Sequence, residues 1–239
     1  MSIINAGNII MNTYVYPCPN GYIMIDTGYE HSLKDVETKL NRKGIKLSDI
    51  KYVFLTHAHD DHAGFLNELL GKNTDLKVIM SDKSMPTLKR GQNSFEGGCS
   101  TVLAWIFCKL MGLVGKAEHR FPVIEDKYNN RFIEITEVNK AELEKILQGK
   151  ILFTPGHTAD SISLKVGNVI FCGDAAMNDF PSIKRLIIWI EDKVEFEKSW
   201  DMMLAEDADI IYPAHGHPFS KSDLAKYKNH ISKIRLRKL

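Results

Sequence analysis

The sequence lacks the excess of one charge sign that marks proteins that bind nucleic acid or anionic membranes. Its 31 basic and 30 acidic side chains are well mixed and leave a formal net charge of +1 over 239 residues. Binding to nucleic acid or to an anionic membrane needs a clustered basic face, which this balance does not provide. A short basic tail at 233–238 is interpreted as a solvated helix end. We therefore expect neither nucleic acid nor membrane as a partner.

Long apolar runs and a cysteine framework are also missing. The longest apolar stretch, Thr101 to Val114, is interrupted by Lys109 and falls short of the roughly 20 residues that a membrane-spanning helix needs. The first eleven residues do not have the charged, apolar and small-residue segments of a signal peptide. Four cysteines stand at unpatterned spacings, which predicts reduced thiols in place of disulfides. These features together predict a cytoplasmic protein with no membrane span.

Strands mixed with helices are what the hydrophobic pattern does contain. The predicted strands are 12–16, 22–25, 51–56, 77–80, 132–135, 151–154, 161–166, 169–172 and 210–212. Helical patterns lie at 33–44, 65–70, 140–147 and 194–205. Each half of the chain contains a strand followed by a short loop with histidine. The pattern favours two sheets packed together and covered by helices.

A dense set of metal-ligand residue types follows the strand at 51–56. His57 and His59 are two apart on an extended backbone, so their side chains point the same way. Asp61 and His62 follow in the turn that leads into a helix. If these four polar side chains were only packed in the protein, each would need its own hydrogen-bond partner. One metal site satisfies all four. Three further candidates stand next to a glycine at later strand ends: His157, Asp174 and His215.

Through these residues the sequence resembles the metallo-β-lactamase superfamily. The family signature is His-x-His-x-Asp-His, then His, then Asp, then His, and it is matched in order by His57, His59, Asp61, His62, His157, Asp174 and His215. Asp26 in Ile-Asp-Thr-Gly fits an early motif of the family, and we expect it to order a loop by hydrogen bonding. The resemblance covers about 12–218, interrupted by 81–121.

The resemblance implies an α+β fold in which two mixed sheets are flanked by helices, the four-layer αββα sandwich. We expect one domain over 1–239 with an inserted, cap-like segment at about 81–121. The apolar part of that segment, 102–114, has three readings that remain open: a buried helix, a cap over the substrate pocket, or a contact in a homodimer.

The resemblance also implies which residues coordinate each of two metal ions. His57, His59 and His157 would hold the first ion, and Asp61, His62 and His215 the second, with Asp174 bridging; Asp61 and Asp174 are assigned a catalytic role as well. Two divalent ions, two carboxylates and one hydroxide leave about one net positive charge, which favours an anionic transition state. Imidazole and carboxylate ligands without cysteine suit Zn²⁺ and also admit Mn²⁺ or Fe²⁺.

The sequence differs from several named subfamilies at key positions, and these differences narrow the range of expected substrates. The classical antibiotic-degrading lactamases carry cysteine where Asp174 stands, and quorum-signal lactonases usually carry tyrosine where Met177 stands. Glyoxalase II enzymes have a longer helical extension at the C-terminus. We predict that a metal-bound hydroxide cleaves a small carbonyl ester, thioester or lactone. The alternatives are phosphodiester hydrolysis on a nucleotide or phospholipid head group, an iron persulfide-type dioxygenase, and a non-catalytic metal-binding module. His59 stands where the di-iron branch of the family carries glutamate, which favours hydrolysis over redox chemistry.

Several nearby residues have simpler interpretations. Asp60 is either a helix N-cap or a support for a ligand histidine, and His217 is an alternative to His215 as ligand. His31, His119 and His230 are interpreted as surface side chains. Core packing is the expected role of Cys172.

Overall fold

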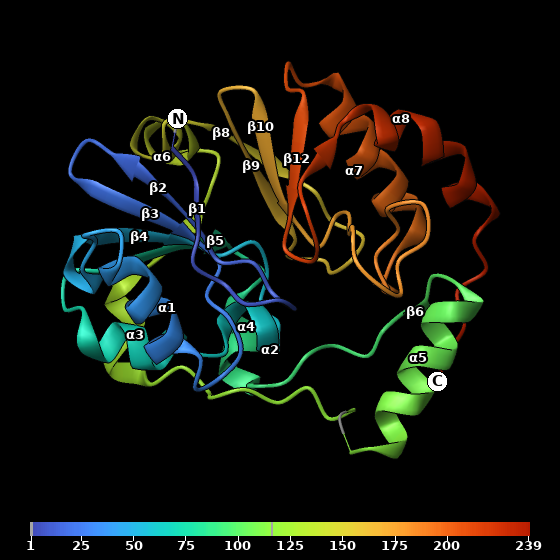
Figure 1. Ribbon diagram of the computed structural model, residues 1–239, viewed down its shortest axis with the longest axis horizontal. Coiled ribbons are helices and arrows are strands. Elements are labelled where there is room, and N and C mark those ends of the chain that lie inside the picture. The colour runs from blue at the N-terminus through green and yellow to red at the C-terminus, as the bar shows by residue number, and fades with distance from the viewer. Residues whose placement is uncertain (1, 116) are drawn as a thin grey trace. The chain divides into compact units, whose positions relative to one another are not determined.

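The computed structural model describes residues 2–115 and 117–239 and divides into two compact units (Figure 1). The first unit contains the chain up to Asn93 together with Arg120–Gly149. The second contains Ser94–His119 and Lys150–Leu239. Each unit has its own sheet and its own hydrophobic core.

The sheet of the first unit is mixed, with strand order β1-β2-β3-β4-β5-β7. Its strands are β1 Ile4–Asn5, β2 Tyr14–Cys18, β3 Gly21–Ile25, β4 Ile50–Phe54, β5 Lys77–Ser81 and β7 Phe132–Ile135. β2 and β3 form an antiparallel hairpin whose turn is Pro19-Asn20. β3, β4, β5 and β7 run parallel to one another. The carboxyl ends of these parallel strands therefore meet at one edge, where the loops after β3 and β4 begin.

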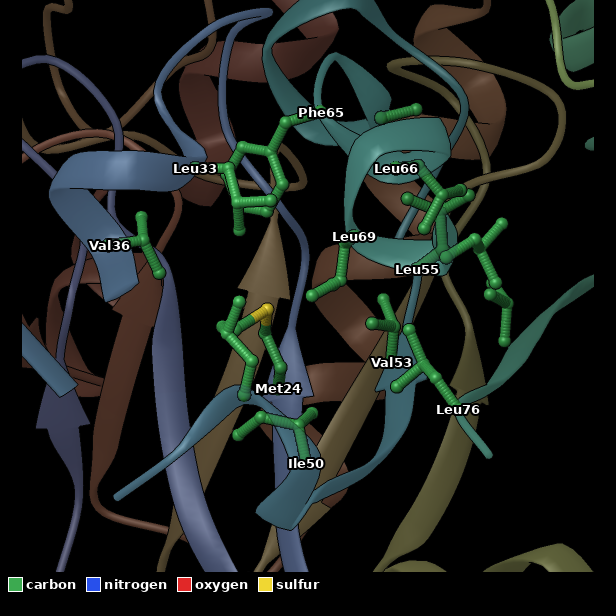
Figure 2. Close-up of a cluster of buried hydrophobic side chains, with 14 of the residues drawn as sticks. Met24, Leu33, Val36, Ile50, Val53, Leu55, Phe65, Leu66, Leu69 and Leu76 are labelled. Carbon is green, nitrogen blue, oxygen red and sulfur yellow. The ribbon is translucent and has the colours of Figure 1, made fainter. Parts of the chain in front are cut away.

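Helices cover one face of this sheet. They are α1 Leu33–Asn41, α2 Asp60–Ala63, α3 Leu66–Lys72 and α4 Met85–Arg90, with 3₁₀ turns at Leu47–Asp49 and Asp126–Arg131. α6 Lys140–Leu147 lies on the other face, where the Leu147 carbonyl accepts a hydrogen bond from Tyr16 Oη. Figure 2 shows α1 and α3 directing Leu33, Val36, Leu66 and Leu69 onto Met24 and Val53 of the strands. Leucines spaced three and four apart give each helix one apolar stripe, which is why it packs on the sheet. The loop that carries His57 to His62 lies between this packed strand and helix.

Arg131 closes the carboxyl end of α3 from within the core. Its guanidinium donates hydrogen bonds to the carbonyls of Leu76 (2.7 Å), Leu70 (3.0 Å) and Asn73. Burial lowers the pKa of this guanidinium below its ordinary value. The charge stays because carbonyls at a helix C-terminus attract a cation.

We expect Arg131→Met to lower the free energy of unfolding by about 3 kcal/mol, because three buried carbonyls lose charged donors. Urea denaturation measures this change. Arg42→Met, on an exposed arginine of the same unit, is the control and should change stability by less than about 0.5 kcal/mol. Equal stability of the two variants would contradict a clamping role for Arg131.

The second unit has a mixed sheet with strand order β13-β12-β10-β9-β8. Its strands are β8 Lys150–Phe153, β9 Ile162–Val166, β10 Val169–Gly173, β12 Ile210–Pro213 and β13 Phe219–Ser220. α7 Lys193–Ala205 and α8 Ser222–Tyr227 pack on it, with a 3₁₀ turn at Lys228–Lys233. Asp192 caps α7 by accepting from Val194 N and Glu195 N. Phe196, Trp200 and Met203 of α7 join Cys172 in one buried cluster, so the expected core packing of Cys172 is confirmed.

A two-stranded ribbon and an apolar helix complete the second unit. β6 Gly98–Cys99 pairs antiparallel with β11 Trp189–Ile190. α5 Val102–Leu113 follows β6, and Thr101 caps it by accepting from Ala104 N. Ala104 is fully buried on this helix, whereas Val102, Ile106, Leu110 and Leu113 are between 44% and 83% exposed. The buried-helix reading of 102–114 is therefore wrong, because the segment has an apolar composition but no core around it.

Two other expectations bear on the same region. The stretch 81–121 is divided, because 81–93 lies in the first unit and 94–119 in the second; Lys116 lies outside the described residues. A single domain with a cap-like insertion stays a prediction.

The tail at 233–238 is not a helix end: the 3₁₀ turn stops at Lys233, and Arg237 pairs with Cys99. In the described part of the chain, no helix has the length and apolarity to cross a membrane.

Candidate metal centre

The first unit gathers four of the predicted ligands at the carboxyl end of β4. His59 lies on extended backbone. The ring centroids of His57 and His59 are 4.5 Å apart, and those of His57 and His62 are 3.9 Å apart. Ligand atoms of His57 lie within 4.8 Å of those of His59 and of His62, as do those of Asp61 and His62. All four side chains are buried, with residue exposures of 8% or less. The local motif thus forms a preassembled group of donors.

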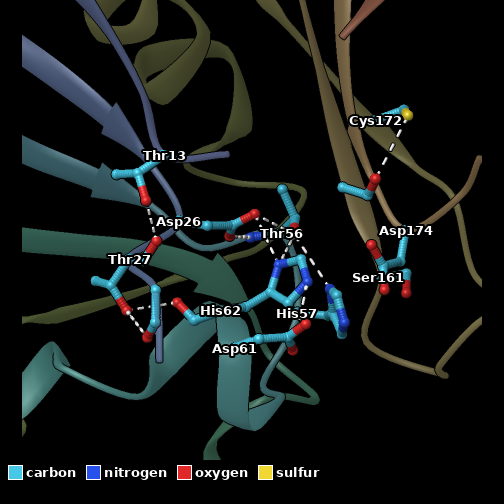
Figure 3. A network of polar contacts seen from close by, with 12 residues as sticks. Thr13, Asp26, Thr27, Thr56, His57, Asp61, His62, Ser161, Cys172 and Asp174 are labelled. Atoms are coloured by element: carbon cyan, nitrogen blue, oxygen red, sulfur yellow. Dashed lines mark hydrogen bonds and ion pairs between the residues drawn. The ribbon is translucent and has the colours of Figure 1, made fainter. Parts of the chain in front are cut away.

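Asp26 holds this group in place from the end of β3 (Figure 3). Its Oδ1 accepts from Thr56 N (2.7 Å), and its Oδ2 accepts from Thr56 Oγ1 (2.8 Å) and from His62 Nδ1 (2.8 Å). Asp26 has a left-handed φ of +56°, which is costly for a residue with a side chain and is typical of functional sites. The expected hydrogen-bonding role of Asp26 is thus seen in the structure.

These contacts fix the tautomers of two histidines. A carboxylate oxygen only accepts, so His62 carries its proton on Nδ1 and presents the lone pair of Nε2. The hydroxyl proton of Thr56 goes to Asp26, so Thr56 Oγ1 accepts from His57 Nδ1 at 3.1 Å. His57 therefore also presents Nε2 as a donor to a metal. Hydrogen-bond partners of this kind commonly orient histidines that bind a metal.

Asp60 is held by Asn93. Its backbone N–H donates to Asn93 Oδ1 (2.9 Å), and Asn93 Nδ2 donates to its Oδ1 (2.7 Å). His59, not Asp60, occupies the N-cap position of α2. The N-cap reading of Asp60 is therefore wrong, and its support of a ligand histidine stays a prediction. The sequence has no signal for Asn93, because it lies 33 residues away in an irregular segment.

The second unit brings together the other three predicted ligands. Asp174 Oδ2 lies 3.4 Å from His157 Nε2, and Asp174 Oδ1 lies 3.5 Å from His215 Nε2. The three side chains come from the ends of three different strands, and all are buried. Each oxygen of the Asp174 carboxylate thus faces a different imidazole.

The loop after β8 is built to orient His157. His157 Nδ1 donates to the carbonyl of Trp189 in β11 (2.8 Å), so its proton is on Nδ1 and its lone pair is on Nε2. Gly156 has a φ of +128°, and a Cβ there would lie 2.3 Å from the backbone nitrogen of Phe196. A side chain at 156 would therefore push His157 out of position.

Glu191, two residues after Trp189, ties down the same loop. Its Oε2 accepts from Ala159 N at 3.0 Å. Burial raises the pKa of the Glu191 carboxyl, while a hydrogen bond with Ser94 and the nearby His157 act in the opposite direction. The sequence analysis did not identify Glu191 or the Trp189 carbonyl, because both are far from His157 in the sequence and approach it only in the folded chain.

His215 is anchored through the loop after Asp174. Asn178 N donates to His215 O (2.9 Å), and Asn178 Nδ2 donates to His217 O (2.8 Å). Gly216 between them has a φ of +86°, and a Cβ would lie 2.1 Å from Asn178 O. His217 is exposed whereas His215 is 8% exposed. Burial therefore favours His215 over His217 as the ligand.

The spacing of these donors fits metal ions. Nitrogen–oxygen separations of 3.4 and 3.5 Å at Asp174, and of 3.7 Å between His62 Nε2 and Asp61 Oδ1, are long for hydrogen bonds. Tetrahedral zinc with bonds of about 2.0–2.2 Å separates its ligand atoms by about 3.3–3.6 Å. The donor set in each unit therefore has the chemistry and the spacing of a metal site.

Comparisons with known proteins identify the family. A model of the metallo-beta-lactamase superfamily matches residues 9–215. The chain therefore belongs to this superfamily, and the predicted membership is confirmed. A probable metallo-hydrolase of Methanocaldococcus jannaschii is 27% identical over 199 residues, which are 81% of this chain and 82% of that protein. The prediction of a metal-dependent hydrolase of this superfamily agrees with these findings.

Other relatives are longer than this chain. An atrochrysone carboxyl ACP thioesterase of Paecilomyces divaricatus is 25% identical over 219 residues, covering 89% of this chain and 53% of that protein. The chain spans little more than half the length of several curated relatives that it matches. A solved variant of a Cronobacter sakazakii metallo-β-lactamase covers 97% of this chain and 89% of its own, with 19% identity and a TM-score of 0.66. Such structures confirm the predicted fold class, the α+β metallo-β-lactamase fold.

The histidines outside the motif behave largely as expected. His31 and His119 are exposed, and His230 is partly buried with its Nδ1 3.2 Å from Tyr227 O. All four cysteines are free thiols. Cytoplasmic location stays a prediction.

Proposed function

We propose that the two donor sets bind two zinc ions in one centre and that this centre hydrolyses a small carbonyl ester, thioester or lactone. His57, His59 and His157 hold one ion, Asp61, His62 and His215 hold the other, and Asp174 bridges the two. Membership of the superfamily supports joining the sets, because the seven residues match its signature in order.

The position of Asp174 is the observation that carries this proposal. A carboxylate that serves a single ion would direct its oxygens to the same set of imidazoles. The two oxygens of Asp174 instead face His157 and His215, each at tetrahedral ligand spacing. The two histidines are assigned to different ions, so this arrangement supports a bridge and therefore two ions.

The remaining residues of the site act by orienting donors. Asp26 and Thr56 keep the Nε2 lone pairs of His57 and His62 available, and the Trp189 carbonyl does the same for His157. Two bound zinc ions would supply an activated water at neutral pH and would polarise the electrophilic oxygen of the substrate. Asp61 and Asp174 would offset part of the cationic charge, and the net positive charge that remains would favour an anionic transition state.

The proposed substrate class rests on the chemistry of the ligand set and on the name of one relative. The ligand set contains no cysteine at position 174, unlike that of the classical antibiotic-degrading lactamases, and a relative carries the name of a thioesterase. A carbonyl carbon bonded to oxygen or sulfur is therefore the preferred electrophile. Phosphodiesters are the alternative that a di-metal site also accommodates.

The test is a substrate panel combined with metal analysis of the purified protein. The panel contains p-nitrophenyl acetate, a thioester, a homoserine lactone and bis-p-nitrophenyl phosphate. We expect two zinc ions per chain and turnover of at least one of the three carbonyl substrates. Turnover of the phosphodiester alone would overturn the substrate class, and one iron per chain would overturn the hydrolase proposal.

A pair of neighbouring histidines gives the matched control. His215→Ala should reduce the zinc content to about one per chain, since one ion loses a ligand. His217→Ala, two residues along on the exposed side of the same loop, should keep both ions. The reverse result would assign the ligand role to His217.

A further inference from the structure

Arg185 is a charged side chain of the second unit that the proposed function has not yet used. It lies in the loop that leads from β10 to β11, and its side chain is 28% exposed. Its Nε and Nη2 donate to Asp223 Oδ2 at 2.9 and 2.7 Å, and its Nη1 donates to Asn178 Oδ1. Asp223 is in the first turn of α8. The guanidinium therefore joins α8 to the loop that follows Asp174.

Several contacts fix the position of this guanidinium. The buried ring of Phe219 in β13 has its centroid 4.9 Å from Arg185 Cζ, an arrangement in which a cation and an aromatic ring attract each other. Arg185 has a left-handed φ of +65°, which is a strained conformation for a residue with a side chain. Its carbonyl accepts from Met177 N at 3.1 Å. Backbone and side-chain contacts thus hold Arg185 in one orientation.

Arg185 determines which way the side-chain amide of Asn178 points. A guanidinium can only donate hydrogen bonds, so it faces Asn178 Oδ1 and leaves Nδ2 to donate to His217 O, 2.8 Å away. The backbone N–H of Asn178 donates to His215 O at 2.9 Å. Asn178 therefore binds the carbonyls on both sides of Gly216, whose φ of +86° forms the turn.

We propose that Arg185 is a positioning residue for the second metal ion, acting through Asn178 on the turn that carries His215. The inference rests on the proposed function, in which His215 is a ligand of that ion. Without the guanidinium, the Asn178 amide is free to rotate and exchange Oδ1 with Nδ2, and the hydrogen bond to His217 O is then lost. The turn keeps one clamp in place of two, so His215 is held less firmly in the orientation that binds the ion.

This effect should be selective for one ion. His157, the ligand of the first ion in the same unit, is oriented by a different contact, the Trp189 carbonyl at 2.8 Å. Changing a residue that orients a ligand weakens metal binding by about 10–100-fold. Loss of Arg185 should therefore weaken the second ion by about this factor and leave the first unchanged. A general loosening of the second unit would weaken both ions, because His157 belongs to that unit too.

The experiment titrates the metal-free, full-length protein with zinc in competition with a chelating dye. It compares Arg185→Met with Lys184→Met, a change at an exposed neighbour that also has a left-handed φ, +59°. Lys184→Met should bind both ions as the wild type does, whereas Arg185→Met should bind the second ion about 10–100-fold more weakly. Equal binding of the second ion by the two variants, or equal weakening of both ions in Arg185→Met, would overturn the proposal.

Two variants of Asp223 test whether position or charge matters. Both hydrogen bonds from Arg185 go to one oxygen, Oδ2, so the amide oxygen in Asp223→Asn can still accept them. Asp223→Ala leaves no acceptor. We expect Asp223→Asn to keep the affinity for the second ion close to that of the wild type, and Asp223→Ala to resemble Arg185→Met. Equal losses in the two Asp223 variants would contradict positioning by hydrogen bonds.

A measurement without metal separates this proposal from the proposed function. The amide of Asn178, which donates to His215 O, should exchange its hydrogen about tenfold faster in metal-free Arg185→Met than in metal-free Lys184→Met. Unchanged exchange would overturn the positioning role even if the enzyme hydrolyses its substrate with two ions. One zinc ion per wild-type chain would overturn the two-ion centre, and faster exchange in Arg185→Met would then still support the role of Arg185 in fixing the turn.

Discussion

Asp174→Ala is expected to lower kcat/KM by roughly a thousandfold, more than the 10–100-fold effect of changing a residue outside the ligand set. Each oxygen of this carboxylate lies at ligand spacing from a different histidine, 3.4 Å from His157 and 3.5 Å from His215. Removing it takes a ligand from both proposed ions at once and also removes one negative charge. Both effects weaken metal binding and the alignment of the activated water.

The fold should survive this change. Asp174 is held by the end of β10, and the packing of that strand depends on apolar neighbours such as Ile170 and Cys172. Steady-state kinetics, zinc content and circular dichroism measured together separate loss of the site from loss of the fold. Asp179→Ala, five residues later on an exposed position, should behave as wild type. Unchanged turnover in Asp174→Ala would rule out the bridging role.

The candidate ligands of the first unit could be identified from the sequence because they are local. His57, His59, Asp61 and His62 follow one strand within six residues, and the strand direction sets where the side chains point. The main strands and helices were predicted with end errors of a few residues, since their apolar spacing is regular. Short elements such as β6 and β11 were missed, because two residues carry no periodicity.

The supporting contacts could not be predicted in the same way. His157 is oriented by a backbone carbonyl of Trp189, which any residue could supply. Asn93 and Asn178 reach the site from irregular loops, and loops carry little hydrophobic pattern. These residues are visible only once the chain is folded.

The apolar segment after β6 shows where composition alone misleads. A run rich in valine, leucine and isoleucine is typical of a buried helix, yet Leu113 of α5 is 83% exposed. An apolar stripe of this kind on a soluble surface is a feature that commonly marks a contact site. The cap and dimer readings of 102–114 therefore both stay predictions.

Asp26→Asn is expected to weaken zinc binding by about 10–100-fold, although Asp26 is not assigned as a ligand. Oδ1 of the amide can still accept from Thr56 N, but the new NH₂ group cannot accept from Thr56 Oγ1 or His62 Nδ1. His62 then loses the partner that keeps its proton on Nδ1. Zinc binding at Nε2 would have to compete with the wrong tautomer.

The same substitution should lower the free energy of unfolding of the metal-free protein by about 2–3 kcal/mol, since buried hydrogen bonds to a charged group are lost. Zinc affinity is measured by competition with a chelating dye, and stability by urea denaturation with and without zinc. Asp35→Asn, on an exposed acidic residue of α1, controls for the charge change. A weaker fold with unaltered zinc affinity would mean that Asp26 supports only the loop. A loss of both stability and zinc affinity would mean that the hydrogen bond from His62 to Asp26 also orients His62 for metal binding.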